Sequence, residues 1–372
     1  MLIFQFILAF GIMLALHEGG HFIMSKLFGI EVEEFGFGLP PRLCKLFTWK
    51  GTDFTLNWIP FGAFVKPKGE FDDPTDNSLR NAPAWKQILI CLAGPLMNLL
   101  TAALLYTICI HQIGFSDPSR VIIDSVARNS AAESAGMLPG DQLVEAGGAP
   151  ITSLESVSEV TNQYLDREMS VVVLRKGETL DLNVVPSSNP PEGQGAMGIV
   201  ITYPLVPVTI GQSISAGFDN TYYMLKQYLI GLGQMITGKI EMGLDSIVGP
   251  VGMFSFYKEA AEQDEADSEV VEQTIAEREA VGGDTEIQTN STKQTPWLNR
   301  LSFFAMISVC IGVTNLFPIP ALDGGRILML LPELFTGKKV PIKVETAVNT
   351  ACMMILYILM GVVMFKDIFM MK

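Results

Sequence analysis

The sequence predicts an α-helical polytopic membrane protein with about four transmembrane helices, a small membrane-associated β-sheet and one inserted α+β domain. Hydrophobic residues make up 49% of the 372 residues and charged residues only 17%, which is unusually apolar for a soluble protein. Apolar runs near the length that spans a bilayer, about 20 residues, recur along the chain. The segments between them carry strand and turn patterns, so soluble parts must connect the spans.

The apolar runs and the segments between them set the expected order of elements. The first run has no basic leader and no small-residue cleavage site, so we expect it to stay in the mature protein. The expected order is transmembrane helix 1 over 1–28, a cytoplasmic loop with the sheet over 29–86, transmembrane helix 2 over 87–112, an α+β domain over 119–187, an interfacial or re-entrant helical region over 207–256, an acidic linker over 257–297, transmembrane helix 3 over 300–335 and transmembrane helix 4 over 346–366.

The distribution of Lys and Arg predicts the orientation of these spans. Both residue types gather in the loops 27–86 and 326–343, and loops rich in Lys and Arg stay in the cytoplasm. The long 113–299 region is then extracytoplasmic. The formal net charge of −14 argues against nucleic acid as a partner, and the apolar spans make the lipid bilayer one. Two polar motifs, HEGGH in the first span and LDGG in the third, are thereby predicted to lie at a similar membrane depth.

The 119–187 region has the pattern of a compact α+β domain. "VIIDSV" and "QLVEA" are typical of strands, "LESVSEVTNQYL" of an amphipathic helix, and the segment around Lys176-Gly177 of a β-hairpin. The string "SAGMLPGDQLVEAGGAPI" resembles a PDZ domain, a fold that captures extended peptides or C-termini along a strand edge. The alternative is a small α+β spacer with no binding role.

The HEGGH motif places ionisable side chains inside an apolar run. His17 and His21 are four residues apart and share one helical face, so both imidazoles can reach one metal ion. Glu18 lies beside them and can act as the general base for a water. Gly19 and Gly20 weaken a helix by about 1 kcal/mol each but would let another backbone approach closely. The alternative, stray polar residues in a buried helix, is costly because ionisable groups within spans are rarely tolerated without a function.

A catalytic zinc site usually has three protein ligands, so a third ligand is needed. His111 is at the outer end of the second span, and its depth excludes it. Asp323, in "NLFPIPALDGGR", has the right depth and follows Pro318 and Pro320, which break the helix. Unwound backbone at membrane depth is tolerated where it lines a water-filled cavity. The alternative is an aspartate that caps a helix beginning at Gly324. Ligand type favours Zn²⁺ over other divalent ions.

Several motifs together resemble those of the site-2 protease family of intramembrane zinc metalloproteases. They are HEGGH, "AGPLMN" at residues 93–98, "FGFG", "PFGAFVK", "GPVG" and "NLFPIPALDGG", and their order is closest to the bacterial RseP-type branch. The resemblance implies that His17, His21 and Asp323 are zinc ligands and that Glu18 is the general base. It also implies that Asn315 supports the substrate or the tetrahedral intermediate. The sequence departs from the family in Gly62-Ala63-Phe64, in its single PDZ pattern and in the acidic stretch at 258–296.

The resemblance implies hydrolysis of a peptide bond within or near the transmembrane segment of single-span membrane protein substrates, such as anti-sigma factors or signal-peptide remnants. It places the protein in the bacterial inner membrane, with the active site near the cytoplasmic side. The PDZ-like domain would be extracytoplasmic and would filter or tether substrates. The acidic stretch is expected to be a solvated disordered or loosely helical linker, or else to select substrates by charge. The alternative functions are a catalytically silent PDZ membrane adaptor and a metal transporter, which would need polar residues on several spans.

Overall fold

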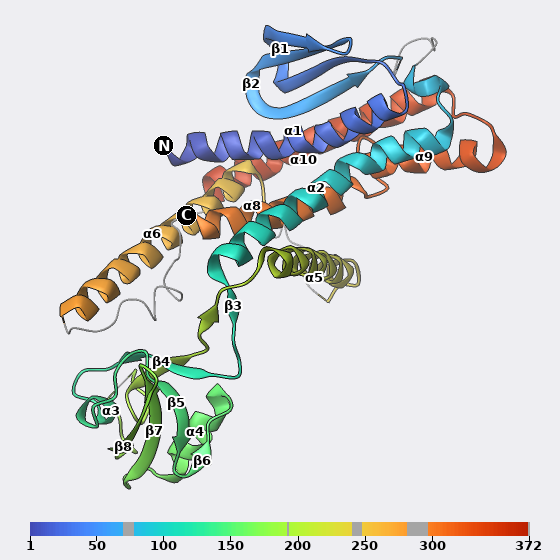
Figure 1. The fold of residues 1–372 in the computed structure, drawn as a ribbon. Coiled ribbons are helices and arrows are strands. Elements are labelled where there is room, and N and C mark those ends of the chain that lie inside the picture. Colours follow the sequence, from blue (N-terminus) through green and yellow to red (C-terminus); the bar gives the residue numbers. More distant parts are fainter. Residues whose placement is uncertain (70–77, 192, 240–247, 281–296, 371–372) are drawn as a thin grey trace. The chain divides into compact units, whose positions relative to one another are not determined.

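The computed structural model describes residues 1–69, 78–191, 193–239, 248–280 and 297–370. Its contacts divide the chain into two compact units (Figure 1). Unit 1 consists of residues 1–109, 211–266 and 296–372, and unit 2 of residues 110–210 and 267–295. Each unit is described below by itself.

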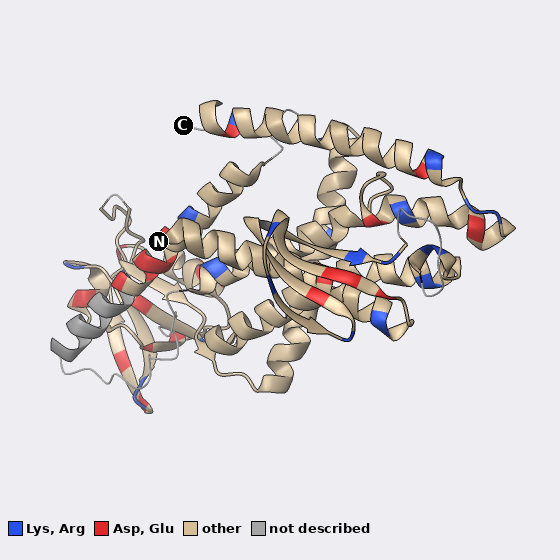
Figure 2. Ribbon diagram, turned by 90° about the horizontal axis from the view of Figure 1, so that it is seen from above, with Lys and Arg blue, Asp and Glu red and all other residues tan. Residues whose placement is uncertain are grey.

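Four helices of the described chain are long and apolar enough to cross a membrane. They are α1 (Leu2–Leu27), α2 (Ala84–Ile113), α8 (Leu298–Asn315) and α10 (Ile342–Met370), and each overlaps one of the four predicted spans. The third span, predicted over 300–335, is not one helix, because α8 ends at Asn315 and a second helix begins only at Asp323. Figure 2 shows α10, which ends at the label C, as free of charged residues along its middle and charged near both ends. The uncharged middle suits a segment that lies in hydrocarbon. Near the C-terminal end, Asp367 is 2% exposed and accepts hydrogen bonds from the backbone N–H groups of Gly249 and Gly252.

The remaining helices of unit 1 pack against these four. They are η1 (Leu79–Asn81), α5 (Ile210–Ile236), the part of α6 (Pro250–Ala280) up to residue 266, and α9 (Asp323–Thr336). An aromatic cluster joins α1, α6 and α8 through Phe6, Tyr257, Phe303 and Phe304. A second cluster joins α2, α8 and α5, and it includes Ala102, Val309, Val313 and Tyr228. The helix α5 covers much of the region predicted to be interfacial or re-entrant.

The predicted acidic linker starts too early, because the chain at 257–264 is part of the packed helix α6. Asp264 is 2% exposed and accepts hydrogen bonds from the backbone N–H of Asn299 (2.8 Å) and from Nε of Arg300 (2.7 Å). A carboxylate at the first turn of α8 satisfies backbone N–H groups that have no partner within that helix. Asp264 is therefore structural, whereas Glu259 and Glu262 before it are exposed. Residues 281–296 of the predicted linker lie outside the described residues.

The predicted sheet is a long hairpin of β1 (Val32–Trp49) and β2 (Thr52–Pro67). Lys50 and Gly51 at its tip have φ values of 47° and 78°, as a two-residue type I′ turn requires. The start of β1 pairs with both ends of β2, since Phe35 faces Phe54 on one side and Val65 on the other. The segment 63–67 is thereby an edge of the folded hairpin. Phe22 of α1 packs against Val32 and Phe35 and fixes the hairpin on α1.

Unit 2 contains the predicted α+β domain. Its sheet has the strand order β8-β7-β5-β4-β9, with β6 paired to β5. The elements are β3 (Phe115–Ser116), β4 (Val121–Val126), α3 (Ala131–Ser134), β5 (Gln142–Ala146), β6 (Ala149–Pro150), α4 (Leu154–Gln163), β7 (Met169–Arg175), β8 (Glu178–Val184), β9 (Ile199–Thr202) and β10 (Leu205–Val206). The hairpin at Lys176-Gly177 is confirmed, with φ values of 52° and 84°. The strand β9, which pairs with β4, lies beyond the predicted limit at 187.

Candidate metal centre

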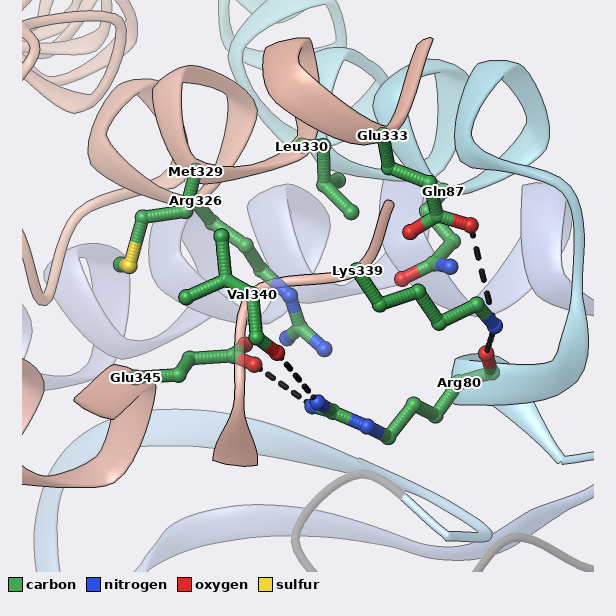
Figure 3. A pocket seen from close by; sticks show the side chains of 9 residues that line it. All are labelled: Arg80, Gln87, Arg326, Met329, Leu330, Glu333, Lys339, Val340 and Glu345. Atoms are coloured by element: carbon green, nitrogen blue, oxygen red, sulfur yellow. Dashed lines mark hydrogen bonds and ion pairs between the residues drawn. The ribbon is translucent and has the colours of Figure 1, made fainter. Parts of the chain in front are cut away.

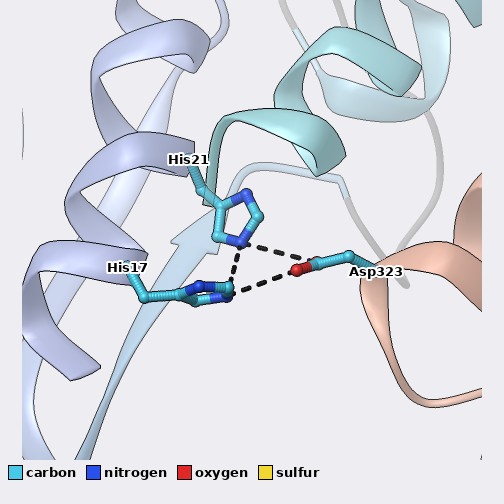
Figure 4. A group of neighbouring side chains, drawn as sticks. All are labelled: His17, His21 and Asp323. Atoms are coloured by element: carbon cyan, nitrogen blue, oxygen red, sulfur yellow. Dashed lines mark hydrogen bonds and ion pairs between the residues drawn. The ribbon is translucent and has the colours of Figure 1, made fainter. Parts of the chain in front are cut away.

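The two histidines of α1 point their ring nitrogens at one place. His17 and His21 lie one turn apart, and their Nε2 atoms are 3.3 Å from each other (Figure 4). The other nitrogen of His21, Nδ1, is 2.7 Å from the carbonyl oxygen of Ile90 in α2. Only an N–H can donate to a carbonyl, so Nδ1 carries a proton and Nε2 keeps its lone pair when the ring is neutral. The backbone of α2 thus orients the His21 ring with its free lone pair toward His17.

Asp323 reaches the same place from the break between α8 and α9. The helix α8 ends at Asn315, and α9 begins at Asp323 with Leu322 as its N-cap. The chain turns back so sharply that a Cβ on Gly324 would lie 2.1 Å from the carbonyl oxygen of Leu316. Only glycine fits at such an approach, which explains the glycines of the LDGG motif. The alternative that Asp323 caps a helix is not observed, since Leu322 occupies the cap position.

The three side chains fit a zinc ion. The His17 Nε2 atom is 3.3 Å from Asp323 Oδ2, and the His21 Nε2 atom is 3.4 Å from Asp323 Oδ1 (Figure 4). Together with the 3.3 Å between the two Nε2 atoms, these distances set the two nitrogens and the Asp323 carboxylate group, which meets each nitrogen with a different oxygen, at the corners of a triangle. In a tetrahedral zinc site with bonds of about 2.0–2.1 Å, neighbouring ligand atoms lie about 3.3 Å apart. Two imidazoles and a carboxylate are also a common donor set for catalytic zinc, and they leave a fourth position open.

The helices α1 and α2 are in close contact at the histidines, and glycines on both helices make room for this contact. A Cβ on Gly20 would lie 2.3 Å from the carbonyl oxygen of Ala93, and a Cβ on Gly94 would lie 2.3 Å from Nε2 of His21. The expectation that the glycines of HEGGH admit another backbone is therefore confirmed for Gly20. It is wrong for Gly19, where an added Cβ would meet nothing within 4 Å. Gly94, in the "AGPLMN" motif, leaves the space that the His21 ring occupies.

Glu18 and Asn315 lie at the edge of the same site. One carboxylate oxygen of Glu18, Oε2, accepts a hydrogen bond of 3.1 Å from the backbone N–H of Val65 in β2. The Nδ2 atom of Asn315 is 3.4 Å from His17 Nε2. Both side chains line a cavity of about 270 Å³ together with the three ligand-type residues. The structure thus brings all five candidate residues together, whereas His111 is at the other end of α2.

The sequence did not indicate Val65 or Ile90, because each contributes only its backbone. Arg326 was also missed as a site residue; it follows Asp323 by one helical turn and lines the same cavity. It lines a second, smaller hollow of about 20 Å³ as well (Figure 3). There Arg80 donates to Glu345 (2.6 Å) and to the carbonyl oxygen of Val340 (2.8 Å). These bonds tie η1 to α10 and to the segment between α9 and α10.

Three side chains that could hold a metal ion, with a carboxylate beside them and among helices long and apolar enough to cross a membrane, fit a membrane-embedded metal hydrolase. Residues 5–359 match the model of peptidase family M50, and the chain belongs to this family of site-2 proteases. It is accordingly an integral membrane zinc metalloprotease.

Proteins that align with nearly the whole chain have names that agree with this family. The chain is 30% identical over 367 residues to a protein of Clostridium acetobutylicum named as a zinc metalloprotease. The aligned region covers 97% of this chain and 96% of the relative. The chain is 32% identical over 364 residues to one of Clostridium perfringens with the same description, with 97% of each chain covered. It is 22% identical over 452 residues to the regulator of sigma-W protease RasP of Bacillus subtilis, with 98% of each covered.

Proposed function

We propose that this chain hydrolyses a peptide bond within or near the transmembrane segment of single-span membrane proteins, with His17, His21 and Asp323 as zinc ligands. The observation that carries the proposal is the approach of the two Nε2 atoms to within 3.3 Å of each other and to 3.3 and 3.4 Å from the two oxygens of the Asp323 carboxylate. When bound there, zinc supplies Lewis acidity for the scissile carbonyl group and makes water a stronger acid. The chain's own side chains must then hold and move the protons.

Glu18 is the general base of this proposal. Its carboxylate lines the cavity beside the ligand atoms but is not one of the three that form the triangle. The N–H of Val65 holds Oε2, so the carboxylate is fixed while its other oxygen can accept a proton. Glu18 takes a proton from the attacking water and delivers it to the leaving amine. It can change its protonation state without releasing a ligand.

Asn315 supports the substrate or the tetrahedral intermediate. Its carboxamide stands at the last residue of α8, with Nδ2 3.4 Å from His17 Nε2, and it lines the cavity. A carboxamide N–H in this position can donate to an oxygen of the reacting carbonyl group. Such a donor contributes most when negative charge develops on that oxygen.

The edge of the hairpin receives the substrate backbone in this proposal. A transmembrane helix hides its peptide bonds, so the substrate must first unwind. The segment 63–67 pairs with the start of β1 on one side, and Val65 lies at the cavity wall. An extended peptide gains main-chain hydrogen bonds by adding to a sheet edge. Substrate helices that contain Gly or Pro should therefore be favoured, because they unwind at lower cost.

We extend the proposal to sidedness and partners. The Lys and Arg content of the loops supports a cytoplasmic site and an extracytoplasmic unit 2 in a bacterial inner membrane. The "SAGMLPGDQLVEAGGAPI" string supports a PDZ-like role for unit 2, which would bind a peptide or C-terminus and filter or tether substrates. The name of the Bacillus subtilis relative, a regulator of sigma-W, supports anti-sigma factors as substrates beside signal-peptide remnants.

The test is cleavage of a tagged single-span substrate by the full chain in proteoliposomes, with bound zinc measured in each sample. Glu18→Gln should keep its zinc and cleave about 100- to 10,000-fold more slowly. Glu262→Gln is the matched control, since Glu262 is 62% exposed on α6, pairs with Lys258 and does not line the cavity, so this variant should cleave as wild type. His17→Ala and Asp323→Ala should lose zinc.

Two results would contradict the proposal. One is a folded wild-type protein that binds no zinc. The other is a Glu18→Gln variant that cleaves at the wild-type rate.

A further inference from the structure

We infer that Asn98 is a positioning residue that holds the His17 imidazole with its Nε2 lone pair directed at the metal. Asn98 lies on α2 and is completely buried. Its Nδ2 atom is 3.1 Å from Nδ1 of His17, the ring nitrogen that faces away from the ligand triangle. Its other carboxamide atom, Oδ1, is buried and has no hydrogen-bond partner among the described residues. This inference rests on the proposed function, because it assumes that His17 is a ligand.

The role of Asn98 follows from which ring nitrogen of each histidine must carry a proton when the other binds a metal. A neutral imidazole that offers Nε2 to a metal carries its proton on Nδ1, and that N–H needs an acceptor in an apolar interior. For His21 the acceptor is the carbonyl oxygen of Ile90, 2.7 Å away. For His17 the group at the equivalent position is the Asn98 carboxamide. A metal ligand without such an outer partner loses both its ring orientation and part of its basicity.

The carboxamide can supply the acceptor by turning about its last side-chain bond. The oxygen and nitrogen of an asparagine side chain occupy nearly equivalent positions, and only the hydrogen-bond network distinguishes them. As drawn, Nδ2 donates to Nδ1 of His17, which places the His17 proton on Nε2, where Asp323 Oδ2 is 3.3 Å away. Turned by half a rotation, Oδ1 faces Nδ1 and accepts its proton, and Nε2 is freed for the metal. The turn also gives Oδ1 a partner that it otherwise lacks. A carboxamide can donate to Nδ1 of His17 or accept a hydrogen bond from it, so it pairs with either tautomer of the imidazole. An apolar side chain pairs with neither tautomer.

The packing around Asn98 fixes the position of its backbone but does not require a carboxamide side chain. Gly94, one helical turn earlier on α2, leaves room for the histidine rings, so the same face of α2 carries both residues. On the other side, Ser308 of α8 donates to the backbone carbonyl of Asn98 at 2.8 Å. A Cβ on Gly312 would lie 3.2 Å from Cβ of Asn98, which shows how closely α8 approaches. None of these contacts uses the carboxamide, so they do not require an asparagine. The His17 contact does.

The test measures the zinc dissociation constant of the full chain in detergent by competition with a chelator of known affinity. Asn98→Leu removes the acceptor at similar volume and should weaken zinc binding about 10- to 100-fold. Asn98→Asp keeps an acceptor oxygen and should bind zinc at least as tightly as wild type. Ser308→Ala is the matched control, because it removes a buried hydrogen bond to the same residue without touching His17. Its zinc dissociation constant should be unchanged. A change in the visible absorption of the Co²⁺-substituted Asn98→Leu protein should accompany the loss.

Three results would overturn the inference. They are wild-type zinc affinity in Asn98→Leu, an equal loss in Ser308→Ala, and an equal loss in Asn98→Asp. If Asn98→Leu does not fold, as judged by thermal unfolding, Asn98→Ala replaces it with the same expectation. Failure of the proposed function is separable, since it would appear as a wild-type chain without zinc or as a His17→Ala variant that retains it.

Discussion

The two units of the molecule bury different kinds of side chain. The core of unit 2 is aliphatic and includes Val121, Ile123, Val171 and Val173, each at most 1% exposed. The interior of unit 1 contains in addition His17 and Asn98, which are polar and lie among apolar helices. A buried polar group costs free energy unless it is partnered, so it persists where chemistry or a hydrogen bond requires it. The buried polar side chains at the metal centre of unit 1 therefore point to its function, whereas the buried Asp141 of unit 2 pairs with Arg175 and points only to its fold.

The difference extends to the glycines. In unit 2 the glycines of the hairpins, such as Gly147 and Gly177, supply positive φ values of 58° and 84° to turns. At the metal centre Gly20, Gly94 and Gly324 instead leave out a side chain where another segment approaches. A turn glycine affects local geometry, but a glycine at a contact between segments sets the distance between candidate ligands on different helices.

The largest effect is expected from a substitution at Gly20, and the adjacent Gly19 provides the control. Gly20→Ala should weaken zinc binding and lower cleavage by about 100-fold, because its Cβ would lie 2.3 Å from the Ala93 carbonyl oxygen and force α1 away from α2. Gly19→Ala should keep both, since the added methyl group meets nothing within 4 Å. Zinc titration and the cleavage assay measure the pair. Equal behaviour of the two variants would show that the contact between the helices does not position the ligands.

The next effect should be confined to unit 2. Asp141 is 1% exposed and accepts from Nε of Arg175 at 2.7 Å, and this hydrogen bond raises the pKa of Arg175 above its ordinary value. Arg175→Met leaves a buried carboxylate without that partner and should destabilise unit 2 by about 3 kcal/mol. Hydrogen exchange of the β7 amides in the full chain measures this, with zinc affinity expected to stay at the wild-type value. A matching loss of zinc affinity would mean that the metal centre depends on the stability of unit 2.

The sequence predicted the spans and four of the five candidate site residues because each stands out locally, whereas Asn315 came only from the resemblance to the site-2 protease family. His17, Glu18 and His21 are ionisable residues in an apolar run, and Asp323 follows two prolines at the same depth. Each signal lies in a short stretch and needs no knowledge of the packing. The α+β pattern of unit 2 was predicted for the same reason, down to the turn at Lys176-Gly177.

Features that depend on contacts between distant segments could not be predicted. The roles of Gly94 and Asn98 follow from the register of α2 against α1, which no local pattern encodes. The pairing of Phe35 with both ends of β2 is equally non-local. Asp264 resembles every other acid in its stretch, and only the approach of α8 makes it buried. The strand β9 has four residues and lies after a long polar loop, so its alternation is too short to recognise.

Asp264 tests whether a buried carboxylate of unit 1 can be purely structural. Asp264→Ala should lower the stability of unit 1 by about 2 kcal/mol, because the backbone N–H of Asn299 and the side chain of Arg300 lose their acceptor. Glu265→Ala is the matched control, since Glu265 is exposed on the same helix. Thermal unfolding followed by tryptophan fluorescence measures both variants, with Trp297 next to the affected helix start. If Asp264→Ala instead left stability unchanged and altered substrate choice, the acidic stretch would act on substrates from its first residues.

The smallest effect should come from the ion pair between Arg80 and Glu345, whose atoms are 2.6 Å apart (Figure 3). Both side chains are partly exposed, at 16% and 17%, so their coupling should be about 1 kcal/mol or less. A double-mutant cycle with Arg80→Met and Glu345→Gln, followed by thermal unfolding, isolates this coupling from the bond between Arg80 and the Val340 carbonyl. Zinc affinity should not change in any of the variants, because neither side chain contacts a ligand atom. A loss of zinc affinity in Arg80→Met alone would show that the hollow next to Arg326 and the metal cavity act as one site, and that polar groups beyond the ligand triangle help to hold the metal.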